Sequence, residues 1–293
     1  MIMERTWGSR IFDAVNITIL LVVALVCFLP FVHVIAGSFA TSEELLSKPF
    51  LLFPTQFSLD AFRYIFSTDS LMRSMFVTVT ITVGGTLINI VLSSMTAYPL
   101  SRSDLLGRRP LMLMIVFTLM FHGGMIPQFL LIKQLGLLDS LWALMLPTAI
   151  NAFYLIILRN FFQQLPAGLE ESAKIDGCND FGILLRIVFP LSLPAIATLT
   201  LFYSVMHWNT FMNAILYIND ANKWPIQVLL RSIVLLSEGG IGDSTAMSAD
   251  IMQIPPESVK MAVITVATLP VLMVYPFLQK YFAKGILLGS VKG

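Results

Sequence analysis

Charged residues are scarce in this sequence. Asp, Glu, Lys and Arg make up only 12% of its 293 residues, whereas 57% of the residues are hydrophobic. A typical soluble domain has about 25% charged residues, so this composition predicts a protein with several membrane-spanning segments. The net charge of +1 argues neither for nor against a polyanionic partner, and no nucleic-acid partner is expected.

The sequence also lacks the common motifs for metals, disulfides and nucleotides. Its three histidines (His33, His122 and His207) are far apart and no HExxH or CxxC spacing occurs, so no metal site is expected. Cys27 lies in an apolar run and Cys178 in a polar loop, which argues against a disulfide framework. No GxxxxGK(S/T) phosphate loop is present. We therefore expect this chain to bind no cofactor.

Two function classes are disfavoured by what the apolar runs lack. No run carries a convergent catalytic set, such as Ser with His or two Asp, as a polytopic membrane enzyme would need. No run has Asp or Glu in its middle, although intramembrane carboxylates are usual in ion-coupled secondary transporters. Both classes are kept as alternatives to the interpretation developed below.

Six apolar runs are long enough, at about 20 residues, to cross the hydrocarbon core of a bilayer. They predict an all-α polytopic fold in one membrane domain over residues 1–293. The first run exceeds the apolar region of about 7–15 residues in a signal peptide, so we interpret it as a retained span. The third is interrupted at Phe121–Pro127, where two glycines and a proline free backbone groups that must be buried in protein or line a cavity. The runs are Ala14–Ile35, Met72–Leu100, Leu111–Ile132, Leu141–Leu158, Leu191–Ile218 and Val259–Phe282.

Six spans place both termini on one side of the membrane. That side receives 11 of the 18 Lys and Arg residues, although the two longest loops, Gly37–Leu71 and Asn219–Glu257, lie opposite. Loops rich in Lys and Arg are usually cytoplasmic. We therefore expect cytoplasmic termini in a multi-pass protein.

The polar stretch Leu169–Pro194 lies on the same cytoplasmic side. Its four acids outnumber its two bases, Lys174 and Arg186. An amphipathic connector at the lipid headgroups is one reading, but such anchors usually carry Lys and Arg on their polar face. The excess of acid favours a protein partner instead. The acids are Glu170, Glu171, Asp176 and Asp180.

Local signals in this stretch predict two helices joined by a tight turn. Pro166 can begin the first helix, and Gly177 supplies the backbone freedom that ends it. Asn179 or Asp180 can cap the second helix. An apolar face is predicted for that helix at i, i+3, i+4 and i+7, and two prolines are expected to close it. The face is Phe181, Leu184, Leu185 and Val188, and the prolines are Pro190 and Pro194.

The stretch resembles the EAA loop of ABC-importer permeases. The matching residues are Glu171-Ser172-Ala173-x-x-Asp176-Gly177-Cys178, followed by Ile187-x-x-Pro190-Leu191-x-x-Pro194. Ser172 and Cys178 stand where the family pattern has alanine, and both are still small. Trp208-Asn209 and the tail KGILLGSVKG extend the likeness to maltose-like, binding-protein-dependent carbohydrate importers. Within these the chain resembles the LplC-like branch and the second permease of an alginate importer.

This resemblance implies a type I ABC-importer permease fold in a bacterial cytoplasmic (inner) membrane. It implies a second homologous permease, two ATPase subunits that bind ATP and Mg, an extracytoplasmic solute-binding protein that the outer loops contact, and surrounding membrane lipid. The expected cargo is alginate or another oligosaccharide, with a non-sugar solute as the alternative. The residues expected to couple this chain to the ATPase are Glu170, Glu171, Ser172, Ala173, Lys174, Asp176, Gly177, Cys178 and Arg186.

Polar and aromatic residues within the spans are candidates for the substrate pathway, because polar groups are expensive at membrane depth. Sugars are bound by aromatic faces together with amide and hydroxyl groups. Contacts between helices use the same residue types and are the alternative role for each of them. The candidates are Gln128, Asn151, Tyr154, Tyr203, His207, Trp208, Asn209 and Asn213.

Overall fold

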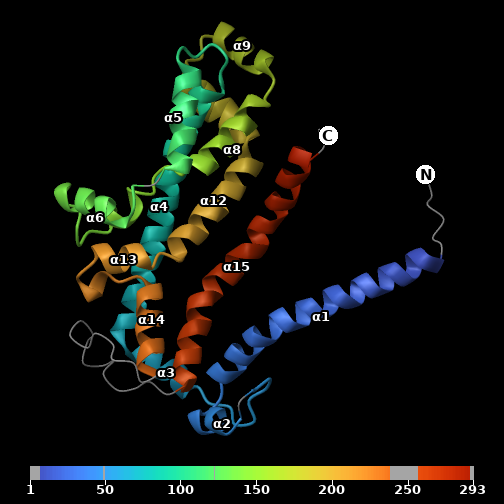
Figure 1. Cartoon of the computed structure of the whole chain (residues 1–293), viewed down its shortest axis with the longest axis vertical. Helices are drawn as coiled ribbons and strands as arrows, with labels where there is room; N and C mark the ends of the chain where they lie inside the picture. Colours follow the sequence, from blue (N-terminus) through green and yellow to red (C-terminus); the bar gives the residue numbers. More distant parts are fainter. Residues whose placement is uncertain (1–6, 49, 122, 238–256, 291–293) are drawn as a thin grey trace. The chain divides into compact units, whose positions relative to one another are not determined.

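A computed structural model describes residues 7–48, 50–121, 123–237 and 257–290. These residues form helices joined by loops, with one isolated bridge between Ala40 and Phe57 (Figure 1). His122, the end of the C-terminal tail and residues 238–256 of the second outer loop lie outside the described residues, as do Arg5 and Lys292 of the charge count. The chain divides into two compact units, Met1–Asp69 with Ser232–Thr268, and Ser70–Arg231 with Leu269–Gly293.

Three helices are long and apolar enough to cross a membrane: α1 (Trp7–Ser38), α4 (Asp69–Ser101) and the segment Glu257–Val274 of α15 (Glu257–Ser290). Three further candidates are bent pairs, so the described residues provide up to six spans. The expected set of six apolar segments is thus present, but half of them are not continuous helices.

The bent pairs have angles of 115°, 52° and 85°. The first joins α5 (Arg108–Met120) and α6 (Met125–Gln134), where the sequence predicted an interruption. The second joins residues 142–148, which include α7 (Trp142–Met145), to α8 (Ala152–Gln163), and the third joins residues 180–191 to α12 (Leu193–Trp208).

The fourth and fifth apolar runs are each divided between separate helices. In the fourth run, Pro147 lies at the end of one helix and Asn151 begins the next by capping α8. The fifth run ends its helix at Trp208 with Asn209 as the C-cap, and α13 (Met212–Tyr217) is a separate helix. Hydropathy cannot reveal such breaks, because the residues that make them are few in an otherwise apolar segment.

The first unit contains α1, α2 (Ser42–Ser47), α3 (Asp60–Ser67) and the beginning of α15. Its small core is formed by Ala36, Ala40, Leu45, Leu51 and Met261. Only the last three residues of α1 are buried, so its apolar side chains are otherwise exposed in the isolated chain. Such a surface suits lipid or another membrane protein.

Glu44 organises the loop that follows α2. Its carboxylate accepts hydrogen bonds from the backbone N–H groups of Thr55 (3.0 Å) and Gln56 (3.0 Å), and Lys48 Nζ donates another at 2.8 Å. These donors, led by Lys48, lower the pKa of Glu44 to about 2. The ionised carboxylate therefore replaces regular secondary structure as the partner of the loop backbone.

Protonation of Glu44 is expected to loosen this loop. Because the folded-state pKa lies below the unfolded value, the stabilisation is complete above about pH 4.5 and is lost as the pH falls towards about 2. Hydrogen exchange at the Thr55 and Gln56 amides, corrected for intrinsic rates, should show protection that declines across this window. Glu44→Gln should lose protection already at neutral pH, and unchanged protection in that variant would contradict the assignment.

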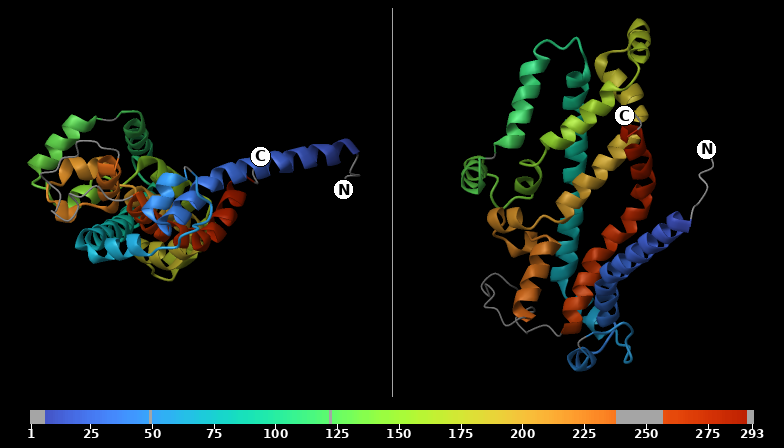
Figure 2. Two further views of the ribbon diagram at one scale, coloured as in Figure 1. Left: turned by 90° about the horizontal axis from the view of Figure 1, so that it is seen from below. Right: turned by 45° about the vertical axis from the view of Figure 1, so that its right-hand side comes forward.

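The second unit is built on α4, whose 33 residues span about 50 Å. α12 runs beside α4, α9 (Ala167–Ile175) lies beyond one end of it, and α13 lies towards the other (Figures 1 and 2). The face of α4 that packs inside the unit is rich in small and polar residues, whereas Phe76, Val83 and Leu87 are exposed. This inverted polarity is typical of membrane helices, whose interfaces favour small and hydrogen-bonding residues. The buried polar residues of α4 are Ser74, Thr78, Thr86, Asn89, Ser93, Ser94 and Ser101.

Asp139 holds the loop between α6 and α7 against the segment after α13. It has a positive φ of 58°, which is uncommon for a residue with a side chain. Its carboxylate accepts hydrogen bonds from the N–H groups of Asn219 (3.1 Å) and Asp220 (3.0 Å) and pairs with Lys223 in η2 (Ala221–Lys223). The Asp220 N–H, followed by Lys223, lowers the pKa of Asp139. The chain then enters α14 (Ile226–Ser237).

Candidate functional site

The polar stretch folds as the predicted helix, turn and helix. α9 begins after Pro166 and ends at Ile175 with Asp176 as its C-cap, and Gly177 follows with a positive φ of 78°. Asn179 caps α10 (Asp180–Ile183), its side-chain oxygen accepting from the N–H of Gly182 at 2.8 Å. The sequence signals for the start, the turn and the cap are therefore confirmed.

The predicted apolar face of the second helix was only half right. Leu184 and Val188 are buried, but Phe181 and Leu185 are exposed, and Ile183 is fully buried instead. The reason is a π-helical turn, η1 (Leu184–Val188), which changes the register that an α-helical repeat assumes.

The predicted helix stop also differs from the observed one. Pro190 lies inside α11 (Phe189–Leu191), so it does not end the segment. The 85° bend follows at Ser192, and Pro194 stands in the first turn of α12, where its missing N–H costs little.

α9 has an inner face and an outer face. Glu170 and Ala173 are turned towards their own chain, with 8% exposure each, and Ala173 belongs to the core cluster that includes Tyr98 and Phe162. The outer face leaves polar and small residues accessible, while Cys178 is half-buried. The exposed coupling candidates are Glu171, Ser172, Lys174, Asp176, Gly177 and Arg186.

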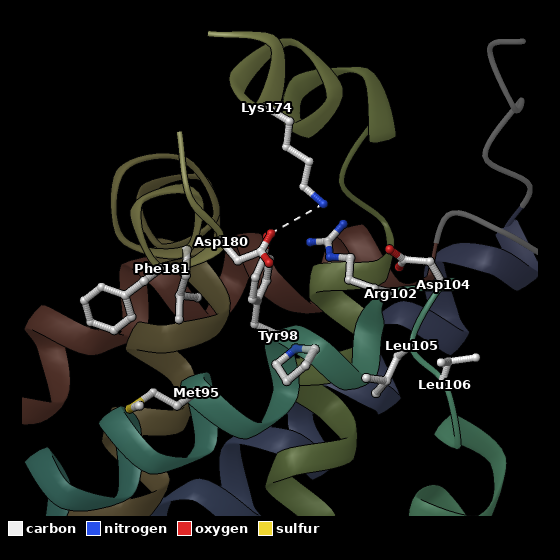
Figure 3. Close-up of a pocket in the computed structure, with 11 residues that line it drawn as sticks. Met95, Tyr98, Arg102, Asp104, Leu105, Leu106, Lys174, Asp180 and Phe181 are labelled. Carbon is white, nitrogen blue, oxygen red and sulfur yellow. Dashed lines mark ion pairs between the residues drawn. The ribbon is translucent and has the colours of Figure 1, made fainter. Parts of the chain in front are cut away.

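Glu170 forms a largely buried ion pair with Arg102, which follows the last turn of α4. Burial raises the pKa of Glu170, and the positive charge of Arg102 opposes that rise. Arg102 borders a cavity of about 540 Å³ that is also lined by Tyr98, Lys174 and Asp180 among others (Figure 3). Arg102 lies in the basic segment SRSDLLGRRP after the second apolar run, and the sequence does not indicate its partner. The position of Arg102 directly after the second apolar run was the only feature of the sequence that could have suggested a role for it.

A second group of polar residues lies between α4 and α12, at the depth of the spans. His207 is 1% exposed, and its Nε2 lies 2.6 Å from Oδ1 of Asn89. The amide nitrogen of Asn89 donates to the carbonyl oxygens of Thr148 and Ala149. The Asn89 oxygen therefore faces His207, which donates through Nε2. One asparagine thus joins α4, α12 and the break before α8.

Tyr203, one turn before His207 in α12, extends this buried hydrogen-bond network. Its hydroxyl accepts from the backbone N–H of Asn151 at 3.3 Å and lies 3.0 Å from Oγ of Ser93 on α4. Asn151 uses its side-chain oxygen to cap α8 through the N–H groups of Phe153 and Tyr154. The structure therefore brings His207, Tyr203 and Asn151 into one hydrogen-bond network with α4. Asn89 and Ser93, which sequence reasoning missed, sit four residues apart on one face of α4.

Of the remaining substrate-pathway candidates, some pack against other side chains and the others line cavities. Tyr154 stacks on Phe202 and meets Tyr203 edge-on, and Trp208 is 7% exposed. A cavity of about 210 Å³ is lined by His207, Asn209 and Asn213 with several neighbours. A second, of about 530 Å³, contains Gln128 and again Asn213. Asn213 is thus common to both.

A protein-family model described as "Binding-protein-dependent transport system inner membrane component" matches residues 89–288. The chain belongs to this family. It is a permease subunit of a binding-protein-dependent ABC transporter and not an enzyme. Membership implies a second permease, an ATPase and a solute-binding protein as partners. It agrees neither with a polytopic membrane enzyme nor with an ion-coupled secondary transporter.

Individual relatives cover the permease almost completely. Permease YtcP of the polygalacturonan/rhamnogalacturonan transport system of Bacillus subtilis (strain 168) is 65% identical over 97% of this chain and 99% of the relative. Protein LplC of the same strain is 53% identical over 99% and 98%. A chain from the crystal structure of a bacterial ABC transporter involved in import of the acidic polysaccharide alginate superposes with a TM-score of 0.85. It is 31% identical, with 94% of this chain and 98% of that chain covered, which confirms the predicted permease fold.

Gly85 is expected to be essential to the buried network. A Cβ atom at Gly85 would lie 2.5 Å from Cε1 and Nε2 of His207, whereas one at Gly84 would meet only Met145 Sδ at 3.3 Å. Gly85→Ala should therefore displace the His207 ring and cost about 1–3 kcal/mol of stability. Thermal unfolding of the purified permease should show a lower Tm for Gly85→Ala than for the adjacent control Gly84→Ala. Equal Tm values would show that α4 and α12 do not approach this closely.

Proposed function

We propose that this permease carries acidic oligosaccharides, those with uronic acid units, through half of a translocation pathway. The observation that supports this best is the 65% identity to a polygalacturonan/rhamnogalacturonan permease over nearly the whole chain. The structural neighbour imports alginate, another acidic polysaccharide. A non-sugar solute is the alternative that the experiment below addresses.

Neutral hydrogen-bonding groups are proposed to meet the sugar. Asn209, Thr210 and Asn213 line the smaller cavity beside His207, and Gln128 lines the larger one. Amides and hydroxyls can both donate to and accept from sugar hydroxyls. In this proposal His207, Tyr203 and Asn151 hold the helices together, because their polar groups are already paired within the chain.

The exposed face of α9 is proposed to dock in a groove of a partner ATPase, which binds ATP and Mg²⁺. Two such ATPase subunits and a second homologous permease would complete the membrane assembly, with the termini of this chain in the cytoplasm. The loops Gly37–Leu71 and Asn219–Glu257 would then face an extracytoplasmic binding protein. Closure of the ATPase pair would move α9 and open the pathway outwards, and hydrolysis would reset it.

The substrate class can be tested with the assembled transporter in proteoliposomes. ATP hydrolysis should be stimulated by the binding protein loaded with oligogalacturonate or oligoalginate, and labelled oligosaccharide should accumulate. Neutral maltooligosaccharides of equal length serve as the matched control. Stimulation by neutral sugars alone would refute the acidic class, and stimulation by none of these sugars would favour a non-sugar solute.

The docking role of the α9 turn predicts a strong effect of Gly177→Trp. A Cβ atom at this position would have no atom within 4 Å other than those of its chain neighbours, so a large side chain there has room to project outwards into the space of the proposed partner. We expect normal membrane insertion but loss of ATPase co-purification and of substrate-stimulated ATP hydrolysis.

Gly177→Asn is the matched control for backbone strain, because Asn tolerates a positive φ better than other non-glycine residues. It should retain the ATPase subunit. If Gly177→Trp also retains normal substrate-stimulated hydrolysis, the turn does not form the docking surface.

A further inference from the structure

The covalent route from α9 to the spans is indirect. It passes through the Gly177 turn, the π-helical turn Leu184–Val188 and the 85° bend at Ser192 before α12 begins. Each of these departs from a straight α-helix, and π-helical turns are rare, single-turn interruptions of α-helical geometry. A movement of α9 would therefore reach the spans more directly through a side-chain contact, if one exists.

Arg102 supplies such a contact. Its guanidinium pairs with Glu170 on the inner face of α9 and lies over the Tyr98 ring, with 4.7 Å from Cζ to the ring centroid. Tyr98 is in the last turns of α4, and Figure 3 shows it next to Arg102 at the edge of the cavity. Arg102 thus lies between the coupling helix and the end of a spanning helix.

The environment of this pair differs from that of its neighbour. The side chains of Arg102 and Glu170 are 19% and 10% exposed. Lys174 and Asp180 form a longer pair of 3.4 Å with 51% and 73% exposure. Water and salt screen the exposed pair, which contributes little. Asp104 is a third acid near Arg102, in addition to Glu170 and Asp180. Arg102 is therefore a cation largely shielded from solvent and surrounded by acidic residues.

Stability alone is a poor explanation for a buried ion pair. Removing two charges from water costs about as much as their attraction returns, and apolar residues of equal size often stabilise better. A guanidinium that pairs with a carboxylate and lies over an aromatic ring is instead geometrically selective. This favours a role in holding α9 at a fixed position relative to α4.

The end of α4 is itself fixed to the rest of the second unit. Nε of Arg159 on α8 donates to the Leu100 carbonyl at 3.1 Å, and Tyr98 and Leu100 belong to the same apolar cluster as Ala173. Further along, α4 carries Asn89 and Ser93 of the buried network. A displacement delivered to the end of α4 would therefore be applied to a helix that is hydrogen-bonded to α12.

We propose that Arg102 is a positioning residue that transmits the movement of α9 to α4, in parallel with the covalent connection to α12. This inference rests on the proposed docking of α9 to an ATPase. It assigns to the turn after the second span a role in coupling hydrolysis to transport, separate from the docking surface itself.

The test uses the complete transporter in proteoliposomes with its binding protein. In Arg102→Ala we expect the ATPase subunit to co-purify as in wild type, while substrate imported per ATP hydrolysed falls roughly two- to thirtyfold, the range for residues that carry coupling between sites. Arg102→Lys keeps the charge but not the planar group, and its loss should be smaller. The double variant Arg102→Ala with Glu170→Gln should be no worse than Arg102→Ala.

Arg109→Ala is the matched control, because Arg109 lies in the first turn of α5 with an exposed side chain, and its import per ATP should be unchanged. Unaltered import per ATP in Arg102→Ala would overturn the inference. Loss of the ATPase subunit from that variant would also overturn it, because Arg102 would then belong to the docking surface. If the wild-type chain binds no ATPase, the proposed function itself fails, and the inference with it.

Discussion

The hydrogen bond between His207 and Asn89 is the contact on which the membrane part of the second unit depends. An unpaired polar group in hydrocarbon costs several kcal/mol, so a histidine and an asparagine at this depth are acceptable only as partners. The amide nitrogen of Asn89 also donates hydrogen bonds to the carbonyl oxygens of Thr148 and Ala149, which the bend before α8 has left without helical partners. One side chain therefore makes both the α4–α12 contact and the broken span possible.

The bent spans follow from the same requirement. Asn151 caps α8, and the hydroxyl of Tyr203 accepts the N–H of Asn151 itself, so backbone groups at this break find partners within the chain. Breaks of this kind are stable in a bilayer only when protein surrounds them. The polar face of α4 supplies that surrounding, which explains why its Ser and Asn residues are buried and its large apolar residues are exposed.

Sequence reasoning was most successful where structure is determined locally. Pro166, Gly177 and Asn179 act through their own backbone and cap geometry, and all three were placed correctly. It was less successful where contacts between distant residues determine the structure. The π-helical turn shifted the buried face of the second helix. Asn89 and Arg102 have roles only through partners that are distant in sequence. The overall count of apolar segments was predictable, since hydropathy reports it directly, and so was the interruption of the third segment at Phe121–Pro127, but the bends in the fourth and fifth segments were not.

Charge and position along α4 distinguish the two groups of polar contacts, the network around Asn89 and the Arg102–Glu170 pair. Between α4 and α12 the contacts are neutral, because an ion pair there would have to overcome the cost of desolvation without nearby water. Beyond the end of α4, Arg102 and Glu170 can be charged, and an ion pair gives a longer-range attraction than a hydrogen bond. In the proposed coupling, the planar guanidinium of Arg102 adds geometric selectivity that holds α9 at a fixed position relative to α4, and the hydrogen bonds between the spans fix their positions through strict geometry. α4 carries one kind at its end and the other in its interior, which makes it a rigid element suited to connect them.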